Sequence, residues 1–266
     1  TGRWPDASEH QHTVLGGPMT TFEGPPIDDV DGIGACTLGG FLDEVVARFG
    51  DNEAVVLDDP LHDGATVRWT YERLGAEAHR VGRALVAAGV EPGDSVGIVM
   101  GNRPEALAAI FGAALAGGVA VPMSTFSPRP ELAHLVATSG VRIVLTQARL
   151  LDRRFGDDLT AIAAERPHVE RVVVLGEERW DSFLAAGDAV AEDDLRARAA
   201  TVTPDDPALV IFSSGTTSEP KGILHAHRSP SLQFWVQAQV FLRQPGTRMF
   251  SALPLFWTAG FNTAVG

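Results

Sequence analysis

The sequence has little cysteine, few basic residues and no long apolar run, and each shortage excludes a class of protein. Cys36 is the only cysteine in 266 residues, which excludes an intramolecular disulfide and a cysteine-based metal site and fits a reducing compartment. Lys and Arg total 21 against 34 Asp and Glu, and the formal net charge of -13 disfavours binding to nucleic acid. The longest apolar stretch, residues 106–121, is shorter than the ~20 residues of a membrane-spanning helix. The N-terminus also lacks an apolar signal-peptide core, so we expect a soluble, cytoplasmic protein without an integral membrane segment.

The overall composition favours a packed globular fold, because 45% of the residues are hydrophobic. Residues 1–36 are the exception. They hold scattered prolines and glycines without a helical or strand period, and they predict an irregular N-terminal extension. His10 and His12 lie in this segment, where histidines are usually solvated, so we assign them no metal.

From residue 37 onward, helix-like and strand-like patterns alternate. Parallel strands produce this alternation, because each pair needs a crossover that is usually a helix. The sequence therefore predicts an α/β fold with a largely parallel sheet covered by helices on both faces. The expected helices are 38–49, 74–85, 106–116, 131–138, 150–165 and 231–242, and the expected strands are 53–57, 66–69, 96–100, 119–122, 141–146, 172–175, 208–212 and 249–253.

Several helix ends carry sequence signals. Thr37 is a candidate N-cap, and Gly50 and Gly89 follow the last apolar residues of the first two expected helices. Asn102 and Glu105 flank a proline at the spacing of a capping box, so we expect both side chains to cap the helix over 106–116.

An acidic segment divides the chain. Residues 177–206 lack a strong apolar strand, and their charge run is typical of a surface helix and linker. We expect a first α/β subdomain over 37–185, an acidic linker over 186–206, and the start of a second subdomain over 207–266. Residues 250–265 are mostly apolar or aromatic and need further burial, so we expect 37–266 to be a truncated domain.

A loop rich in hydroxyl groups follows the expected strand over 208–212. A flexible loop that leaves a buried strand presents backbone N–H groups to an oxyanion. Hydroxyl side chains add donors, and Lys221 adds a positive charge on a long stem. The pattern predicts a phosphate-binding loop formed by Ser213, Ser214, Gly215, Thr216, Thr217 and Lys221.

Two other nucleotide-binding motifs are excluded. The Walker A loop needs glycine before its lysine and a hydroxyl residue after it, whereas Pro220 and Gly222 flank Lys221. No expected strand leads into a G-x-G-x-x-G turn, the dinucleotide-binding motif. Only the alternation of strands and helices would support a nicotinamide dehydrogenase, and that pattern is weak evidence for a function.

The loop closely resembles the phosphate-binding signature of the adenylate-forming superfamily, which includes acyl-CoA synthetases, luciferases and the adenylation domains of peptide synthetases. Other stretches resemble that family in the same order, from about Thr37 to the end of the chain. They are 89–96, 102–105, 115–122 and 254–260. Ser218 departs from the pattern, because many members have glycine there.

The resemblance implies an acid–thiol ligase. In the family, a carboxylic acid attacks the α-phosphate of ATP to give an acyl-adenylate and pyrophosphate, and a thiol then displaces AMP. The loop residues would hold the β- and γ-phosphates beside Mg²⁺, acting by position and charge. Coenzyme A is the first expected acceptor and the phosphopantetheine of a carrier protein is the second. The acid is expected to be fatty or aromatic.

The same resemblance makes Trp257 and Gly260 candidates for the acid pocket. Many family members have histidine at the position of Trp257, next to the acyl group, but an aromatic residue in an apolar run can equally belong to the core. Both alternatives stay open from sequence. His225 and His227 follow the loop, and we expect structural rather than catalytic roles for them.

The later motifs of the family are absent from these residues, including those for magnesium, the ribose and the catalytic lysine. We therefore name no catalytic residue and no metal ligand, and we expect the chain alone not to turn over. A different class of function, a non-catalytic nucleotide-binding or interaction module, also remains open.

Overall fold

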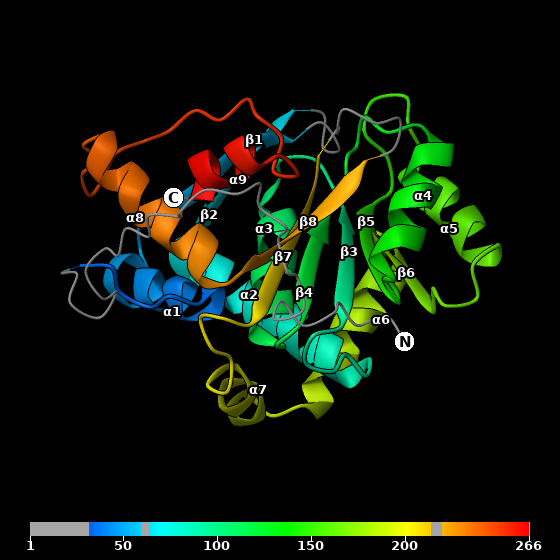
Figure 1. Cartoon of the computed structure of the whole chain (residues 1–266), viewed down its shortest axis with the longest axis horizontal. Helices are drawn as coiled ribbons and strands as arrows, with labels where there is room; N and C mark the ends of the chain where they lie inside the picture. Colours follow the sequence, from blue (N-terminus) through cyan, green and yellow to red (C-terminus); the bar gives the residue numbers. More distant parts are fainter. Residues whose placement is uncertain (1–31, 60–63, 214–219, 266) are drawn as a thin grey trace, which may run out of the picture.

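The computed structural model describes residues 32–59, 64–213 and 220–265. Its centre is a six-stranded sheet with the order β6-β5-β3-β4-β7-β8, in which only β8 is antiparallel to its neighbour (Figure 1). The strands are β3 (Ser95–Val99), β4 (Val119–Pro122), β5 (Ile143–Gln147), β6 (Arg171–Leu175), β7 (Pro207–Ser213) and β8 (Lys221–Ala226). The largely parallel α/β sheet expected from the sequence is confirmed.

Helices cover both faces of the sheet, and each face has its own core. On one face, β3 side chains such as Val96 and Ile98 pack with α1 (Leu38–Phe49), α2 (Tyr71–Ala87), α3 (Pro104–Leu115) and α6 (Glu178–Ala186). On the other face, Val99 and Val121 pack with α4 (Arg129–Ser139) and α5 (Phe155–Ala164). The central strands are buried throughout for this reason, and their sequences are apolar runs rather than alternating patterns.

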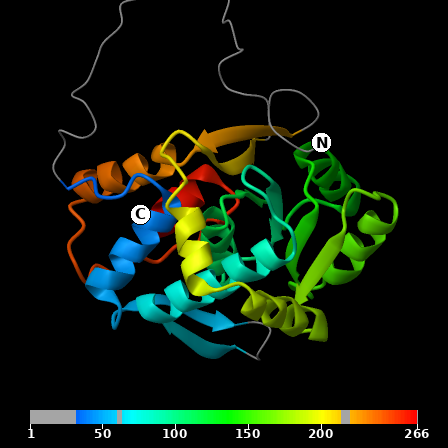
Figure 2. The ribbon, with the colours of Figure 1, turned by 90° about the horizontal axis from the view of Figure 1, so that it is seen from below.

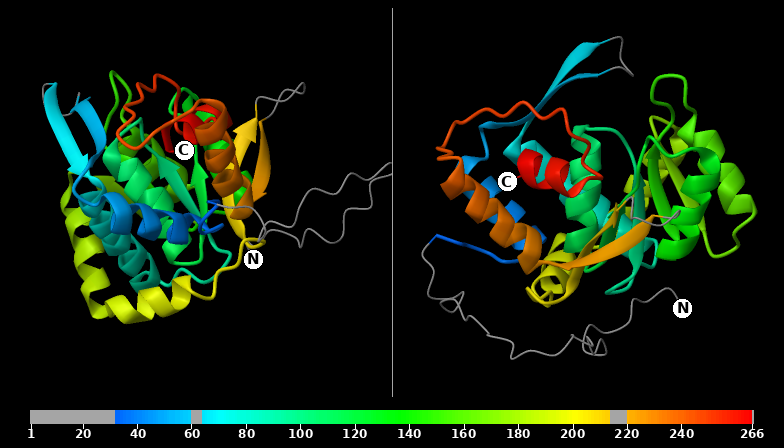
Figure 3. Two further views of the ribbon diagram at one scale, coloured as in Figure 1. Left: turned by 90° about the vertical axis from the view of Figure 1, so that its left-hand side faces the viewer. Right: turned by 45° about the horizontal axis from the view of Figure 1, so that its top comes forward.

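The remaining elements lie around this sandwich. Two strands, β1 (Glu53–Asp59) and β2 (Ala65–Thr70), form a separate antiparallel pair that projects beside the main sheet (Figure 3). The acidic segment contains α6, a short 3₁₀ turn (Gly187–Ala189) and α7 (Glu192–Ala199), which contacts α2 (Figure 2). The chain continues with α8 (Arg228–Val240) and α9 (Thr258–Val265). None of the helices in the described ranges is long and apolar enough to cross a membrane.

The start of α1 and the end of α2 agree with the sequence signals. The Thr37 hydroxyl accepts a hydrogen bond from the Gly40 N–H at 3.2 Å, as expected of an N-cap. Gly89 follows α2 with φ +82°, a left-handed conformation that glycine adopts without strain. Local sequence signals therefore predicted these two helix ends correctly.

Two other local predictions are wrong. The capping box at α3 does not form: Arg103 is the N-cap residue, Glu105 accepts a hydrogen bond from its guanidinium, and the Asn102 side chain binds residues 253 and 255 instead. The strand expected over 249–253 is also not formed. A strand requires a hydrogen-bonded neighbour, and no described strand pairs with this segment, where Phe250 is 91% exposed.

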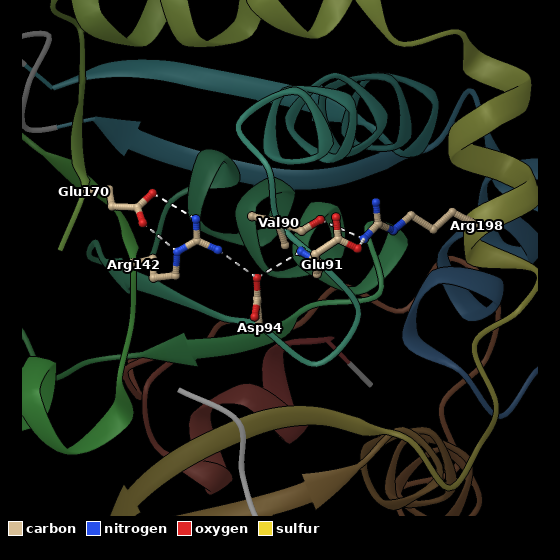
Figure 4. A network of polar contacts seen from close by, with 6 residues as sticks. All are labelled: Val90, Glu91, Asp94, Arg142, Glu170 and Arg198. Atoms are coloured by element: carbon tan, nitrogen blue, oxygen red, sulfur yellow. Dashed lines mark hydrogen bonds and ion pairs between the residues drawn. The ribbon is translucent and has the colours of Figure 1, made fainter. Parts of the chain in front are cut away.

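A network of charged residues links the starts of three parallel strands, at the amino-terminal edge of the sheet (Figure 4). Asp94, Arg142 and Glu170 each directly precede a parallel strand, so the topology brings them together. Arg142 donates to both carboxylate oxygens of Glu170, at 2.9 and 3.0 Å, and to Asp94 at 3.2 Å. Its hydrogen bonds lower the pKa of the Glu170 carboxyl. This network lies at the end of the sheet opposite Ser213, the last residue of β7.

A second charged cluster joins α1, α2 and α7. The side chain of His79 in α2 is 10% exposed, and its Nε2 lies 3.0 Å from Asp43 Oδ1 in α1. Its Nδ1 lies 2.5 Å from Glu192 Oε1 in α7, and the two groups form an ion pair when the imidazole is protonated. The hydrogen bond to Asp43, with the nearby Glu192 carboxylate, raises the pKa of His79 although partial burial opposes it.

This raised pKa predicts a pH-dependent contribution to stability. The His79 imidazolium stabilises the folded state fully below its unfolded pKa of about 6.5, and the contribution disappears as pH rises through the higher folded pKa. His79→Gln should therefore lower the free energy of unfolding by about 1 kcal/mol more at pH 6 than at pH 9. Urea unfolding at both pH values measures this difference. The exposed His168→Gln is the control, and a His79→Gln effect that grows with pH would contradict the assignment.

Candidate functional site

The predicted phosphate loop connects the two strands of a hairpin. Ser213 ends β7 and Lys221 begins β8, and the two residues are paired in the sheet. Ser214, Gly215, Thr216 and Thr217 lie outside the described residues. The hairpin rests on a rigid base, because Ala208, Leu209, Val210 and Ile211 of β7 are all buried. Ser213 and Lys221 are eight positions apart in sequence, and the pairing places them opposite each other at the end of a buried strand.

The hairpin opens at the edge where ligands usually bind in α/β sheets. The parallel strands β3, β4, β5 and β7 all end at this edge, and the antiparallel β8 begins there. Ligands of open α/β sheets commonly lie beyond the carboxyl ends of the strands. Sequence reasoning missed β8, although the branched residues Ile223 and Leu224 that follow the loop were a signal for it.

Lys221 is suited to a phosphate group. It is exposed, and no described carboxylate forms an ion pair with it. It is also the only lysine of the chain, because the other 20 basic residues are arginines, a feature that sequence reasoning overlooked. In a protein with a net charge of -13, an exposed cation without a carboxylate partner among the described residues is a local site for an anion. The arrangement therefore fits the polyphosphate of a nucleotide.

A metal site is not formed by the part of the chain that the structure describes. It contains no group of three or more His, Cys, Asp or Glu side chains that could hold a metal ion.

The two histidines after the loop, His225 and His227, have lowered pKa values, and His227 makes a structural hydrogen bond. His227 is buried, and its Nδ1 accepts a hydrogen bond from the Leu38 N–H at the start of α1, at 3.2 Å. Burial lowers the pKa of His227 to about 4 and also lowers the pKa of His225, so both rings are neutral near pH 7. His227 connects the end of β8 to α1, which agrees with the structural role expected from the sequence.

A second group of candidate residues lies on the segment before α9. Trp257 is 45% exposed, and its ring contacts Phe256 and Phe126, both at 6.0 Å between ring centroids. Phe126 follows β4 and is 66% exposed. It was not predicted, because a single aromatic residue in a loop has no periodicity to reveal it. The three rings form an aromatic cluster, Phe126–Phe256–Trp257, beyond the carboxyl end of β4.

Two contacts fix the backbone that carries Trp257. Asn102 Nδ2 donates to the Leu253 carbonyl at 2.8 Å, and its Oδ1 accepts from the Leu255 N–H at 2.9 Å. Gly260 is buried directly against this turn: a Cβ atom there would lie 1.9 Å from the Pro254 carbonyl oxygen. The close approach requires glycine, which gives this predicted site residue a steric role.

Comparison with known proteins identifies the family of the chain. The family model described as AMP-binding enzyme matches residues 42–265. A 3-[(3aS,4S,7aS)-7a-methyl-1,5-dioxo-octahydro-1H-inden-4-yl]propanoyl:CoA ligase of Mycobacterium tuberculosis is 35% identical over 195 residues, which are 72% of this chain and 37% of that protein. The fatty acid–[acyl-carrier-protein] ligase ScoC of Streptomyces coeruleorubidus is 36% identical over 169 residues, 64% of this chain and 30% of that protein. The chain thus spans about a third of the length of these curated relatives.

A solved structure has the same fold. The inhibitor-bound N-terminal domain of FACL13 from Mycobacterium tuberculosis superimposes with a TM-score of 0.66 at 27% identity, covering 86% of this chain and 54% of that one. The match confirms the α/β fold and the resemblance seen in the sequence motifs. The chain belongs to the AMP-binding enzyme family.

Proposed function

We propose that the complete enzyme activates a carboxylic acid with ATP to form an acyl-adenylate and then transfers the acyl group to a thiol. The observation that carries this proposal is the hairpin that places Ser213 opposite Lys221, which forms no ion pair with the described residues, at the carboxyl edge of the sheet. The expected acid is fatty or aromatic.

The chain's own residues would act by position and charge. A carboxylate is a poor electrophile, and it gains a good leaving group when it attacks the α-phosphate and expels pyrophosphate. The ammonium of Lys221 and the hydroxyl of Ser213 would neutralise the charge that grows on the departing pyrophosphate. Mg²⁺ would accompany ATP and share this charge. Ser214, Gly215, Thr216 and Thr217 complete the loop by the motif.

Coenzyme A is the first acceptor that we propose, because the first of the two relatives above is named as a CoA ligase. A carrier protein is the second candidate, because ScoC is named as an acyl-carrier-protein ligase. We also propose that residues 1–266 alone do not turn over, because the motif for the mobile catalytic lysine is not among them. The predicted subdomains, with a boundary at the acidic linker of 186–206, remain part of this proposal.

Exchange of labelled pyrophosphate into ATP tests the first half-reaction. The complete enzyme should exchange label only when a suitable acid is present, and the 266-residue chain should not exchange it. AMP release measured with coenzyme A and, separately, with a phosphopantetheine-bearing carrier protein then shows which thiol is the acceptor. Failure of the complete enzyme to exchange label with any fatty or aromatic acid, while it still binds ATP, would favour a non-catalytic nucleotide-binding module.

Trp257 should influence the choice of acid. If its half-exposed ring lines the acid pocket, Trp257→Ala should change the relative kcat/KM for large and small acids by about tenfold, which is ~1.4 kcal/mol of discrimination. The KM for ATP should stay nearly constant. Trp235→Ala, on α8, is the control. Equal effects on all acids would show that Trp257 is only a packing residue.

A further inference from the structure

Asn102 forms a bridge between two parts of the chain that are 151 residues apart in sequence. It lies in the loop between β3 and α3, and its side chain is exposed rather than buried in the core. The amide donates to the Leu253 carbonyl at 2.8 Å and accepts from the Leu255 N–H at 2.9 Å. Asparagine is suited to this contact, because its amide pairs with a backbone C=O and N–H as another backbone segment would.

The loop that carries Asn102 is fixed on both sides. The N–H of Gly101 donates to Gln147 Oε1 at 2.7 Å, at the end of β5. Arg103 is 5% exposed and pairs with Asp59 at 3.1 Å and with Glu105 at 2.7 Å. Asn102 therefore extends from an anchored turn, and it can impose a position on the segment that it binds.

The segment that it binds carries two of the three rings of the aromatic cluster, Phe256 and Trp257. Leu255 and Phe256 are buried, whereas Trp257 is 45% exposed. Its backbone N–H donates to the Pro254 carbonyl at 3.1 Å, and its indole contacts the rings of Phe126 and Phe256. The hydrogen bond to Leu253 is exposed and the one from Leu255 is partly buried. At ~0.5–1.5 kcal/mol each, the two are too weak to determine the fold. They are strong enough to select one position of a surface turn. The effect of Asn102 is thus expected on the position of Trp257 and not on global stability.

We propose that Asn102 is a positioning residue that sets the place of Trp257 and thereby the selectivity for the acid. This rests on the proposed function, in which Trp257 lines the acid pocket. The amide holds the 253–255 backbone, the backbone orients the indole against Phe126, and the indole limits the shape of the acid that can bind.

A double-mutant cycle tests this chain of effects. Asn102→Leu keeps the side-chain size and removes both hydrogen bonds, and it should change the ratio of kcat/KM for a large and a small acid by about fivefold, ~1 kcal/mol, with an unchanged KM for ATP. In the Trp257→Ala background the same substitution should change the ratio less than twofold. Asn102→Asp keeps the acceptor for the Leu255 N–H and should have an intermediate effect. Full additivity of the two substitutions would overturn the proposal.

A fluorescence measurement tests the positioning without any activity. Acrylamide should quench Trp257 more strongly after Asn102→Leu, with the contribution of Trp257 obtained by difference from Trp257→Phe variants. The matched control is Asn52→Leu, at an exposed asparagine whose side chain binds no other described element. Unchanged quenching would overturn the proposal. If the complete enzyme activates no acid but quenching rises as expected, the positioning stands and the proposed function fails.

Discussion

Lys221→Met should lower acid-dependent ATP–pyrophosphate exchange by the complete enzyme by ~10²–10³-fold, the usual loss when one stabilising donor is removed from a transition state. The melting temperature should not change, because Lys221 is exposed and forms no ion pair with the described residues. The loss should appear in kcat as well as in the KM for ATP, since the charge on pyrophosphate grows as it leaves.

Two controls separate charge from shape at this position. Lys221→Arg keeps the charge but changes its geometry, and it should retain more activity than Lys221→Met. An amine-selective reagent offers an independent test, because Lys221 is the only lysine in these 266 residues. ATP should protect the Lys221 peptide from labelling, as measured by mass spectrometry. Normal exchange by Lys221→Met, together with labelling that ATP does not affect, would remove the lysine from the site.

Gly260→Ala should disrupt the turn that carries Phe256 and Trp257 of the aromatic cluster. The added Cβ would lie 1.9 Å from the Pro254 carbonyl oxygen and 2.9 Å from that of Leu253, which are backbone atoms that no rotamer change can move. Overpacking of this kind costs ~1–3 kcal/mol, and we expect the upper end of that range in the free energy of unfolding. Acid activation should fall at least tenfold even where the protein remains folded, because Trp257 is displaced.

Gly101→Ala is the matched control for Gly260→Ala. Gly101 lies in the loop after β3, and the nearest atom that its added Cβ would meet, on Leu150, is 3.4 Å away, which is ordinary contact. Urea unfolding and pyrophosphate exchange should both be near wild type for Gly101→Ala. A Gly260→Ala protein with wild-type stability and activity would show that the turn can relax freely.

The sequence was informative where a pattern is local or repeated. The alternation of apolar strands and helices identified the parallel sheet. Parallel strands are covered by helices on both faces, so each is a run of apolar residues that can be recognised in the sequence. The cap at Thr37 and the stop at Gly89 follow from backbone chemistry within a few residues. The phosphate motif was recognisable for the same reason: its hydroxyls, Pro220 and Lys221 are contiguous.

The sequence failed where a residue is used by a distant partner. Asn102 has the spacing of a helix cap, but its amide binds a segment 151 residues away, and nothing near it in sequence indicates this. Residues 249–253 have strand-like composition, but a strand also needs an available neighbour. Phe126 joins Trp257 only through the fold. Tertiary contacts therefore decide the candidate acid pocket, whereas the phosphate loop is a local feature.

The transfer of a carboxylate oxygen to AMP tests the central proposal most directly. The complete enzyme would be given ATP, a thiol and an acid whose carboxylate carries heavy oxygen, and the products would be analysed by mass spectrometry. Attack of the carboxylate on the α-phosphate predicts one heavy oxygen in each AMP, because the thiol later breaks the bond between the acyl carbon and that oxygen. Heavy oxygen in inorganic phosphate or pyrophosphate, with unlabelled nucleotide, would contradict the account.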